Sequence, residues 1–153
     1  ERVNQYLRSF DNEIEGFKMI NQIPHCKKNG EYFELSNFGD GLKHFISIII
    51  GLFNCENSYF FIDEIDTGIH YSKLKLIWDI VFELSQEFGV QVFVTTHSKE
   101  CITSYEQSVR ENDEHDFCFI KLGKNKEGIV KSVTLNDEMF FSEMEQNHEL
   151  RGW

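Results

Sequence analysis

The chain has 153 residues, of which 41% are hydrophobic and 14% aromatic, a composition that predicts one globular domain and excludes a disordered chain. Its formal net charge of −11 argues against a nucleic-acid surface on this chain, because phosphate binding needs clustered Lys and Arg side chains. The longest apolar run, residues 45–53, is too short for a membrane span and no signal peptide is visible, so we expect a cytoplasmic protein.

The four cysteines are far apart and none belongs to a CxxC pair, which disfavours both a zinc site and a disulfide framework. Cys55, Cys101 and Cys118 sit beside apolar residues, and we expect them to be small side chains of the core.

The first part of the chain predicts a helix and two strands. Apolar residues at helical spacing predict a helix over 2–10, and residues 14–23 alternate loosely, as a strand does. The only proline opens the segment 24–30, which is typical of a turn. A short strand over 32–35 follows.

The centre of the chain predicts a parallel unit. Apolar residues cover nearly every side of a helix over 42–53, so we expect it to be buried on most faces. Residues 58–62 predict a strand buried on both faces, and 90–95 a second buried strand. An amphipathic helix over 70–88, closed by Gly89, joins the strands. A crossover of this length is right-handed and brings the carboxyl ends of both strands to one sheet edge.

The last part predicts a helix, a hairpin and another helix. Ser98 suits the cap of a helix over 99–110. Residues 116–122 and 129–135 flank a polar, glycine-containing segment, as the strands of a hairpin do, and Asn136 suits the cap of the final helix. The expected fold class is therefore α/β, with parallel central strands flanked by helices and a C-terminal β-hairpin and helix.

Two adjacent acids, Asp63 and Glu64, follow the first central strand directly. Open α/β sheets hold their ligands at the carboxyl ends of strands. Because neighbouring residues leaving a strand point in different directions, one carboxylate can hold a hydrated Mg²⁺ while Glu64 orients or deprotonates a water. A strand end with two solvated acids is the alternative.

His97 follows the second central strand and is expected at the same edge. There it could hydrogen-bond a γ-phosphate and sense its loss. The alternative is a loop histidine beside the helix cap Ser98, but the pairing with the two acids favours the functional role.

Gly39, Asp40 and Gly41 precede the buried helix. Glycines let the backbone approach a phosphate, and a helix start adds free N–H donors and a partial positive charge. The alternative is a flexible helix start with Asp40 as a simple cap.

Together these elements resemble the second half of an ABC-type ATPase head, in the order signature loop, buried helix, Walker B strand, D-loop, helix, strand and switch histidine. Within that superfamily the chain is most similar to bacterial AAA-family ATPases of the overcoming-lysogenization-defect and AAA15/AAA21 type. Residues 63–70, Asp-Glu-Ile-Asp-Thr-Gly-Ile-His, are similar to that group's Asp-Glu-Ile-Glu-x-Gly-Leu-His. Residues 95–98, Thr-Thr-His-Ser, are similar to its switch segment, and the resemblance is specific over 35–105.

The resemblance implies a P-loop NTPase-like fold with ATP and Mg²⁺ as ligands, in which residues 1–153 are the C-terminal portion of the head. Asp63 would be the Mg²⁺-linked Walker B acid, Glu64 the catalytic glutamate and His97 the switch histidine.

The resemblance also implies a degenerate signature loop over Ser36, Gly39, Asp40 and Gly41, where either Ser36 or Gly39 stands for the signature serine. In ABC-type heads this loop contacts the ATP held by a second subunit. His70 falls near the position of the D-loop aspartate of transporter heads, which leaves its role open.

One required element is missing from the sequence. A P-loop needs Gly-x-x-x-x-Gly-Lys-Ser/Thr, and the only Gly-Lys pair, Gly123 and Lys124, is on the late hairpin. We infer that the Walker A segment lies before Glu1 or on another chain. This segment alone is then expected to bind ATP weakly and to be inactive.

The sequence therefore predicts ATP binding and hydrolysis by a head that dimerises through ATP, with the Walker A segment as a partner and no membrane. DNA or an effector protein stays open as a further partner. Two other classes also stay open: a metal-dependent hydrolase or nuclease that uses Asp63, Glu64, His70 and His97, and a non-catalytic interaction module.

Overall fold

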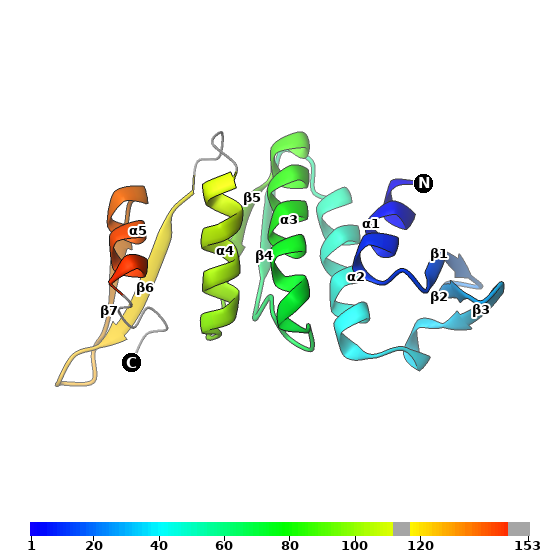
Figure 1. Ribbon diagram of the computed structural model, residues 1–153, viewed down its shortest axis with the longest axis horizontal. Helices are drawn as coiled ribbons and strands as arrows, with labels where there is room; N and C mark the ends of the chain where they lie inside the picture. Colours follow the sequence, from blue (N-terminus) through cyan, green and yellow to red (C-terminus); the bar gives the residue numbers. More distant parts are fainter. Residues whose placement is uncertain (112–116, 147–153) are drawn as a thin grey trace.

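The central helices stand side by side in front of a pair of parallel strands, as Figure 1 shows for the computed structural model of the chain. The structure describes residues 1–111 and 117–146. In chain order the elements are α1 (Arg2–Phe10), β1 (Ile14–Ile20), β2 (Ile23–Lys28), β3 (Glu31–Glu34), η1 (Leu35–Asn37), α2 (Asp40–Phe53), β4 (Tyr59–Ile62), η2 (Tyr71–Lys73), α3 (Leu74–Phe88), β5 (Gln91–Val94), α4 (Lys99–Glu111), β6 (Phe119–Lys124), β7 (Val130–Leu135) and α5 (Asp137–Glu145), where η marks a 3₁₀ helix.

The N-terminal sheet is a meander of β1, β2 and β3, joined by two tight turns. The residues of the first turn, Asn21 and Gln22, have φ of 50° and 65°, and those of the second, Asn29 and Gly30, have 52° and 82°. Two-residue loops with positive φ at both positions match the twist of antiparallel strands.

The predicted turn over 24–30 is wrong for most of its length. Residues 23–28 form β2, in which Pro24 pairs with Met19 of β1, and only Asn29 and Gly30 form a turn. A proline near the beginning of a strand removes a single ladder donor, so it does not prevent the strand.

The parallel unit over 58–95 is confirmed. Strands β4 and β5 pair in parallel with Ile62 opposite Val94, and α3 forms the connection. Helix α3 begins at Leu74, later than predicted, because residues 71–73 form the 3₁₀ turn η2. It ends as predicted, since Gly89 adopts φ 62° in the left-handed region at the cap.

The prediction that 58–62 is buried on both faces is wrong, and β5 is likewise covered on one face alone. Phe61 is 71% exposed and Phe93 42%, and their rings stack with centroids 4.9 Å apart. The opposite face packs on the helices: a Cβ added to Gly51 of α2 would lie 2.3 Å from the ring of Phe60. The continuous apolar run of β4 therefore has one face in the core and one apolar face open to solvent.

The core lies between the helices and the inner faces of the strands. Trp78 of α3 donates from Nε1 to the Cys101 carbonyl of α4 at 3.1 Å, which ties these two helices together. None of the described helices is both long and apolar enough to cross a bilayer. The largest fully buried apolar side chains are Leu7, Ile14, Phe45, Ile49, Leu52, Ile65, Ile77, Leu84 and Phe140.

The cysteines divide differently from the prediction. Cys101 is fully buried as expected and Cys55 is half-buried, but Cys118 is exposed. Cys26, for which no core position was predicted, is fully buried in the N-terminal sheet. All four are free thiols.

The predicted C-terminal hairpin and helix are confirmed in β6, β7 and α5, although Asp116 lies outside the described residues. Asn136 caps α5 as predicted, because its Oδ1 accepts the Met139 N–H at 3.0 Å. Phe140 of α5 is fully buried and stacks on Phe119 of β6, with centroids 4.9 Å apart.

Candidate functional site

The polar ends of β4 and β5 meet at one edge of the sheet, as the sequence predicted. The backbone ladder continues beyond both strands, because the Thr95 N–H donates to the Ile62 carbonyl at 2.9 Å and the Ile65 N–H to the Thr95 carbonyl at 3.2 Å. Asp63 and Glu64 therefore leave β4 directly beside the segment that carries His97.

A threonine hydroxyl links the two segments. Thr95 donates from Oγ1 to Asp63 Oδ1 at 2.5 Å, and the same oxygen accepts the Glu64 N–H at 2.9 Å. Glu64 has φ 48°, in the left-handed region, which costs a residue with a Cβ about 1–2 kcal/mol. Both acids are exposed, so their carboxylates can meet a ligand.

The turn after the acids is fixed from both sides. The Thr67 N–H donates to the Glu64 carbonyl at 2.9 Å, and the Thr67 hydroxyl donates to Glu64 Oε2 at 3.3 Å. Ile65 is 1% exposed and anchors the turn in the core. Thr96 donates from Oγ1 to Asp66 Oδ1 at 2.5 Å, which holds the turn against the β5 segment.

His97 is exposed at the same edge, between two residues whose positions are fixed. Thr96 Oγ1 accepts the Ser98 N–H at 3.1 Å, and Ser98 Oγ accepts the Cys101 N–H at 3.1 Å, which is the helix cap that the sequence predicted. Burial raises the pKa of the Cys101 thiol to about 11, so this sulfur stays protonated at neutral pH and is no nucleophile.

The glycine loop touches the turn after the acids. Gly41 is buried, and a Cβ added to it would lie 2.2 Å from the Gly68 carbonyl oxygen. Gly68 has φ 70°. Gly41 therefore permits a close approach of two backbone segments, whereas a Cβ on Gly39 would meet nothing within 4 Å.

The other loop residues are exposed. Asp40 does not cap α2, because Gly39 holds the cap position without a side-chain bond; the Asp40 carboxylate instead accepts from Lys43 Nζ at 3.1 Å. The Ser36 hydroxyl donates to Glu34 Oε2 at 3.2 Å. Ser36, Gly39 and Asp40 thus form an accessible loop, of which Asp40 lies beside Gly68 in the turn after the acids.

His70 has a local structural role. Its Nδ1 lies 2.9 Å from the Ser72 hydroxyl and accepts the Ser72 N–H at 3.4 Å, which caps η2, and its ring packs on Tyr71. The structure therefore gives His70 a role at the beginning of η2.

Within residues 1–111 and 117–146 no three His, Cys, Asp or Glu side chains are grouped closely enough to hold a metal ion. Mg²⁺ commonly takes one or two protein carboxylates and completes its shell with waters and phosphate oxygens. Asp63 and Glu64 fit that arrangement.

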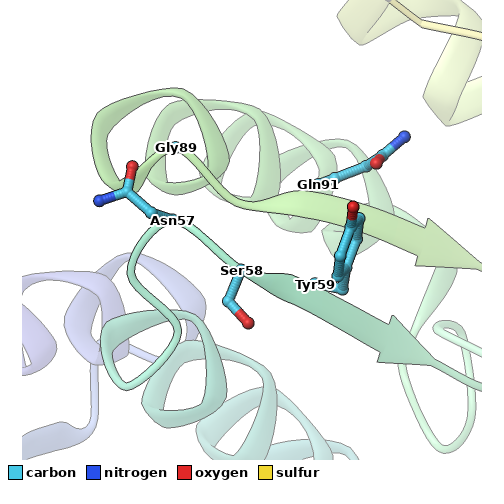
Figure 2. A pocket seen from close by; sticks show the side chains of 5 residues that line it. All are labelled: Asn57, Ser58, Tyr59, Gly89 and Gln91. Carbon is cyan, nitrogen blue, oxygen red and sulfur yellow. The ribbon is translucent and has the colours of Figure 1, made fainter.

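A hollow of about 360 Å³ lies at the N-terminal ends of β4 and β5, at the sheet edge opposite the acids (Figure 2). It has no charged lining residue, and it is separated from Asp63 by the length of β4. Its lining residues are Asn57, Ser58, Tyr59, Gly89 and Gln91.

Comparison with known families decides the relationship. The sequence model of the AAA ATPase domain family matches residues 2–102, about two thirds of the chain. The chain belongs to this family. It is also 30% identical over 155 aligned positions to a protein named ATP/GTP phosphatase from Helicobacter pylori, with 96% of this chain and 42% of that protein covered. The chain thus spans about two fifths of the length of this curated relative.

Solved SMC ATPase heads have the same fold, which is that of P-loop NTPases. An SMC ATPase chain from work on ATP-driven dimerization and DNA-stimulated activation aligns with a TM-score of 0.63 at 17% identity, over 95% of this chain and 88% of that chain. An SMC head bound to the C-terminal winged-helix domain of ScpA aligns with a TM-score of 0.65 at 18% identity, over 92% of this chain and 43% of that chain. The predicted fold class of the AAA ATPase chain is therefore confirmed.

The structure adds residues for which the sequence predicted no role. Thr95 and Thr96 hold Asp63 and Asp66, and Gly68 receives Gly41. Two threonines directly after a buried strand were a visible signal, but their partners depend on the strand register.

Proposed function

We propose that this chain supplies the Mg²⁺-binding acid, the catalytic base and the γ-phosphate sensor of an ATP-hydrolysing head. The observation that carries the proposal is the bridge at Thr95, which sets Asp63, the backbone of Glu64 and the His97 segment at one sheet edge. Membership of the AAA ATPase domain family supports ATP as the nucleotide.

Asp63 would hold the magnesium ion. Its Oδ1 accepts the Thr95 hydroxyl, so Oδ2 is the oxygen left to face the ion or a water bound to it. Bound Mg²⁺ would neutralise phosphate charge during transfer of the γ-phosphoryl group.

Glu64 would orient the attacking water and accept its proton. Its side chain is exposed beside Asp63, and the Thr67 hydroxyl donates to Oε2, which leaves Oε1 for the water. Adjacent acids on a turn divide the work in this way because they point in different directions. His97 would hydrogen-bond the γ-phosphate and register its departure.

The phosphate cradle would come from a Walker A segment outside residues 1–153. The open face of β4 and β5, with Phe61 and Phe93, is the surface that we expect this segment to cover, since exposed stacked aromatic rings favour burial.

The accessible loop with Ser36, Gly39 and Asp40 would act on a second nucleotide. Its exposure supports contact with the ATP held by another copy of the head, so that ATP binding closes a homodimer and hydrolysis opens it. The accessible N–H groups of a helix start suit a phosphate.

Replacing Glu64 by Gln in the full-length protein tests this function. The amide keeps the shape but cannot accept the proton, so we expect the variant to retain ATP and to accumulate as a dimer in size-exclusion chromatography. Glu56→Gln is the matched control, because Glu56 is exposed and lies before β4, away from the acids. A Glu64→Gln protein that binds no ATP in the presence of Mg²⁺ would contradict the proposal.

A further inference from the structure

One hydroxyl at the candidate site serves both acids at once. We propose that Thr95 is a positioning residue: its hydroxyl aims the Asp63 carboxylate at the metal position and holds the Glu64 backbone in the conformation that presents the base. This inference rests on the proposed function and adds a residue to it.

The Thr95 hydroxyl is the donor in one of the two hydrogen bonds and the acceptor in the other. A hydroxyl has one hydrogen to donate and two lone pairs to accept with. In Thr95 the hydrogen goes to Asp63 Oδ1 at 2.5 Å, and a lone pair accepts the Glu64 N–H at 2.9 Å. Because this bond holds Oδ1 in place, it restricts the directions in which Oδ2 can point.

The acceptor bond matters because Glu64 is strained. Its φ of 48° is unusual for a residue with a side chain, and the conformation persists only if its surroundings impose it. Two further contacts help: the Ile65 N–H donates to the Thr95 carbonyl at 3.2 Å, and the Ile65 side chain is buried. These survive substitution of Thr95, so loss of the hydroxyl should loosen Glu64 without unfolding the turn.

The neighbouring threonine has a different task. Thr96 donates to Asp66 and accepts the Ser98 N–H, so its hydroxyl fixes the turn and the helix start, whereas the hydroxyl that bonds Asp63 and Glu64 is that of Thr95. Positioning of the two acids therefore falls to Thr95.

The test compares Thr95→Val, Thr95→Ser and Thr134→Val in the full-length protein. Valine keeps the branched shape and removes the hydroxyl, serine keeps the hydroxyl, and Thr134 is an exposed residue of β7. The measurements are kcat, KM for ATP, the Mg²⁺ concentration at half-maximal activity, and Tm. Thr95→Ala replaces Thr95→Val if the valine variant fails to fold.

We expect Thr95→Val to lower kcat by about 10- to 100-fold and to raise the Mg²⁺ requirement about tenfold, as loss of a group that orients a metal ligand does. KM for ATP should change little, since the Thr95 hydroxyl is occupied by its bonds to Asp63 and Glu64. Thr95→Ser should restore kcat, and Thr134→Val should leave it unchanged. A structural role alone would lower Tm without moving the Mg²⁺ requirement.

Hydrogen exchange of the Glu64 amide tests the link without catalysis. Removal of its acceptor in Thr95→Val should speed exchange at Glu64 by about tenfold, and Thr134→Val should not. Unchanged exchange would overturn the positioning role, and so would Thr95→Ser kinetics as poor as those of Thr95→Val. An active wild type with unaltered Thr95→Val kinetics would contradict the role of Thr95 alone, whereas an inactive wild type would contradict the proposed function.

Discussion

Gly41 and Gly68 bring two segments of the candidate site into backbone contact. A Cβ on Gly41 would lie 2.2 Å from the Gly68 carbonyl oxygen, and a Cβ on Gly68 would lie 2.9 Å from the Gly41 nitrogen. The loop before α2 and the turn after the acids therefore cannot move independently without opening this contact.

Gly41→Ala should destabilise the protein by about 1–3 kcal/mol, because the added methyl group meets main-chain atoms that cannot rotate away. Urea unfolding measures the change. Gly123→Ala is the control, since a Cβ there meets nothing within 4 Å and its effect should stay within about 0.5 kcal/mol. Equal stability of the two variants would contradict the contact.

Thiol labelling should separate the cysteines. Cys118 is exposed and should react first, whereas Cys26 and Cys101 are fully buried and should react only when the protein opens. Burial raises the pKa of both buried thiols to about 11, so Cys26 and Cys101 stay almost entirely protonated between about pH 7 and 9, which adds to their steric protection. Mass spectrometry after timed alkylation gives the order, and early loss of Cys101 would show that the α3–α4 packing is wrong.

The N-terminal sheet should lose stability in acid partly through Glu15. The hydrogen bond from Lys27 and then that from the Gly30 N–H lower the pKa of the Glu15 carboxyl. A lowered folded-state pKa gives stability that is present above the ordinary carboxyl pKa of about 4.3 and is lost as the pH falls below it.

Glu15→Gln should therefore lower Tm slightly at pH 7 and by less at pH 3, because a larger share of wild-type Glu15 is protonated there. Thermal unfolding at both pH values measures this difference. Glu31→Gln, at an exposed position of β3, should show a smaller difference in its Tm effect between the two pH values. A larger loss at pH 3 than at pH 7 for Glu15→Gln would reverse the predicted sign.

Phe61 tests whether the open face of β4 and β5 is covered in the full-length protein. Phe61 is 71% exposed in this structure, so Phe61→Ser should lower the free energy of unfolding only slightly if that face stays in water. If a Walker A segment covers that face, the loss of unfolding free energy should approach about 3–5 kcal/mol, which is typical for truncation of a buried Phe. Ile129→Ser is the control, because Ile129 lies beside β7 and is 55% exposed. Equally small losses in the two variants would show that the face with Phe61 is not covered.

The sequence was sufficient for the parallel unit and for its polar edge, because a buried strand, a crossover helix and a second strand leave little choice of topology. It correctly brought Asp63, Glu64 and His97 to one edge. It could not identify Thr95 as the link, because hydrogen bonding depends on the register of Ile62 against Val94, which no local pattern encodes.

Other features escaped prediction for physical reasons. The run over 59–62 is apolar on both faces, although helices cover only one of them within the described residues. Gly41 had the spacing of a phosphate-binding glycine, and its close approach to Gly68 required the three-dimensional structure. Pro24 suggested a turn, whereas the positive φ angles at Asn29 and Gly30 determine where the chain reverses.

Steady-state ATP turnover of the full-length protein with Mg²⁺ tests the central claim most directly. Glu64→Gln should lower kcat by about 10²- to 10⁴-fold, the usual loss of a general base, while Glu56→Gln keeps the wild-type rate. Turnover by Glu64→Gln at the wild-type rate would contradict the assignment of Glu64 as the base of an ATPase.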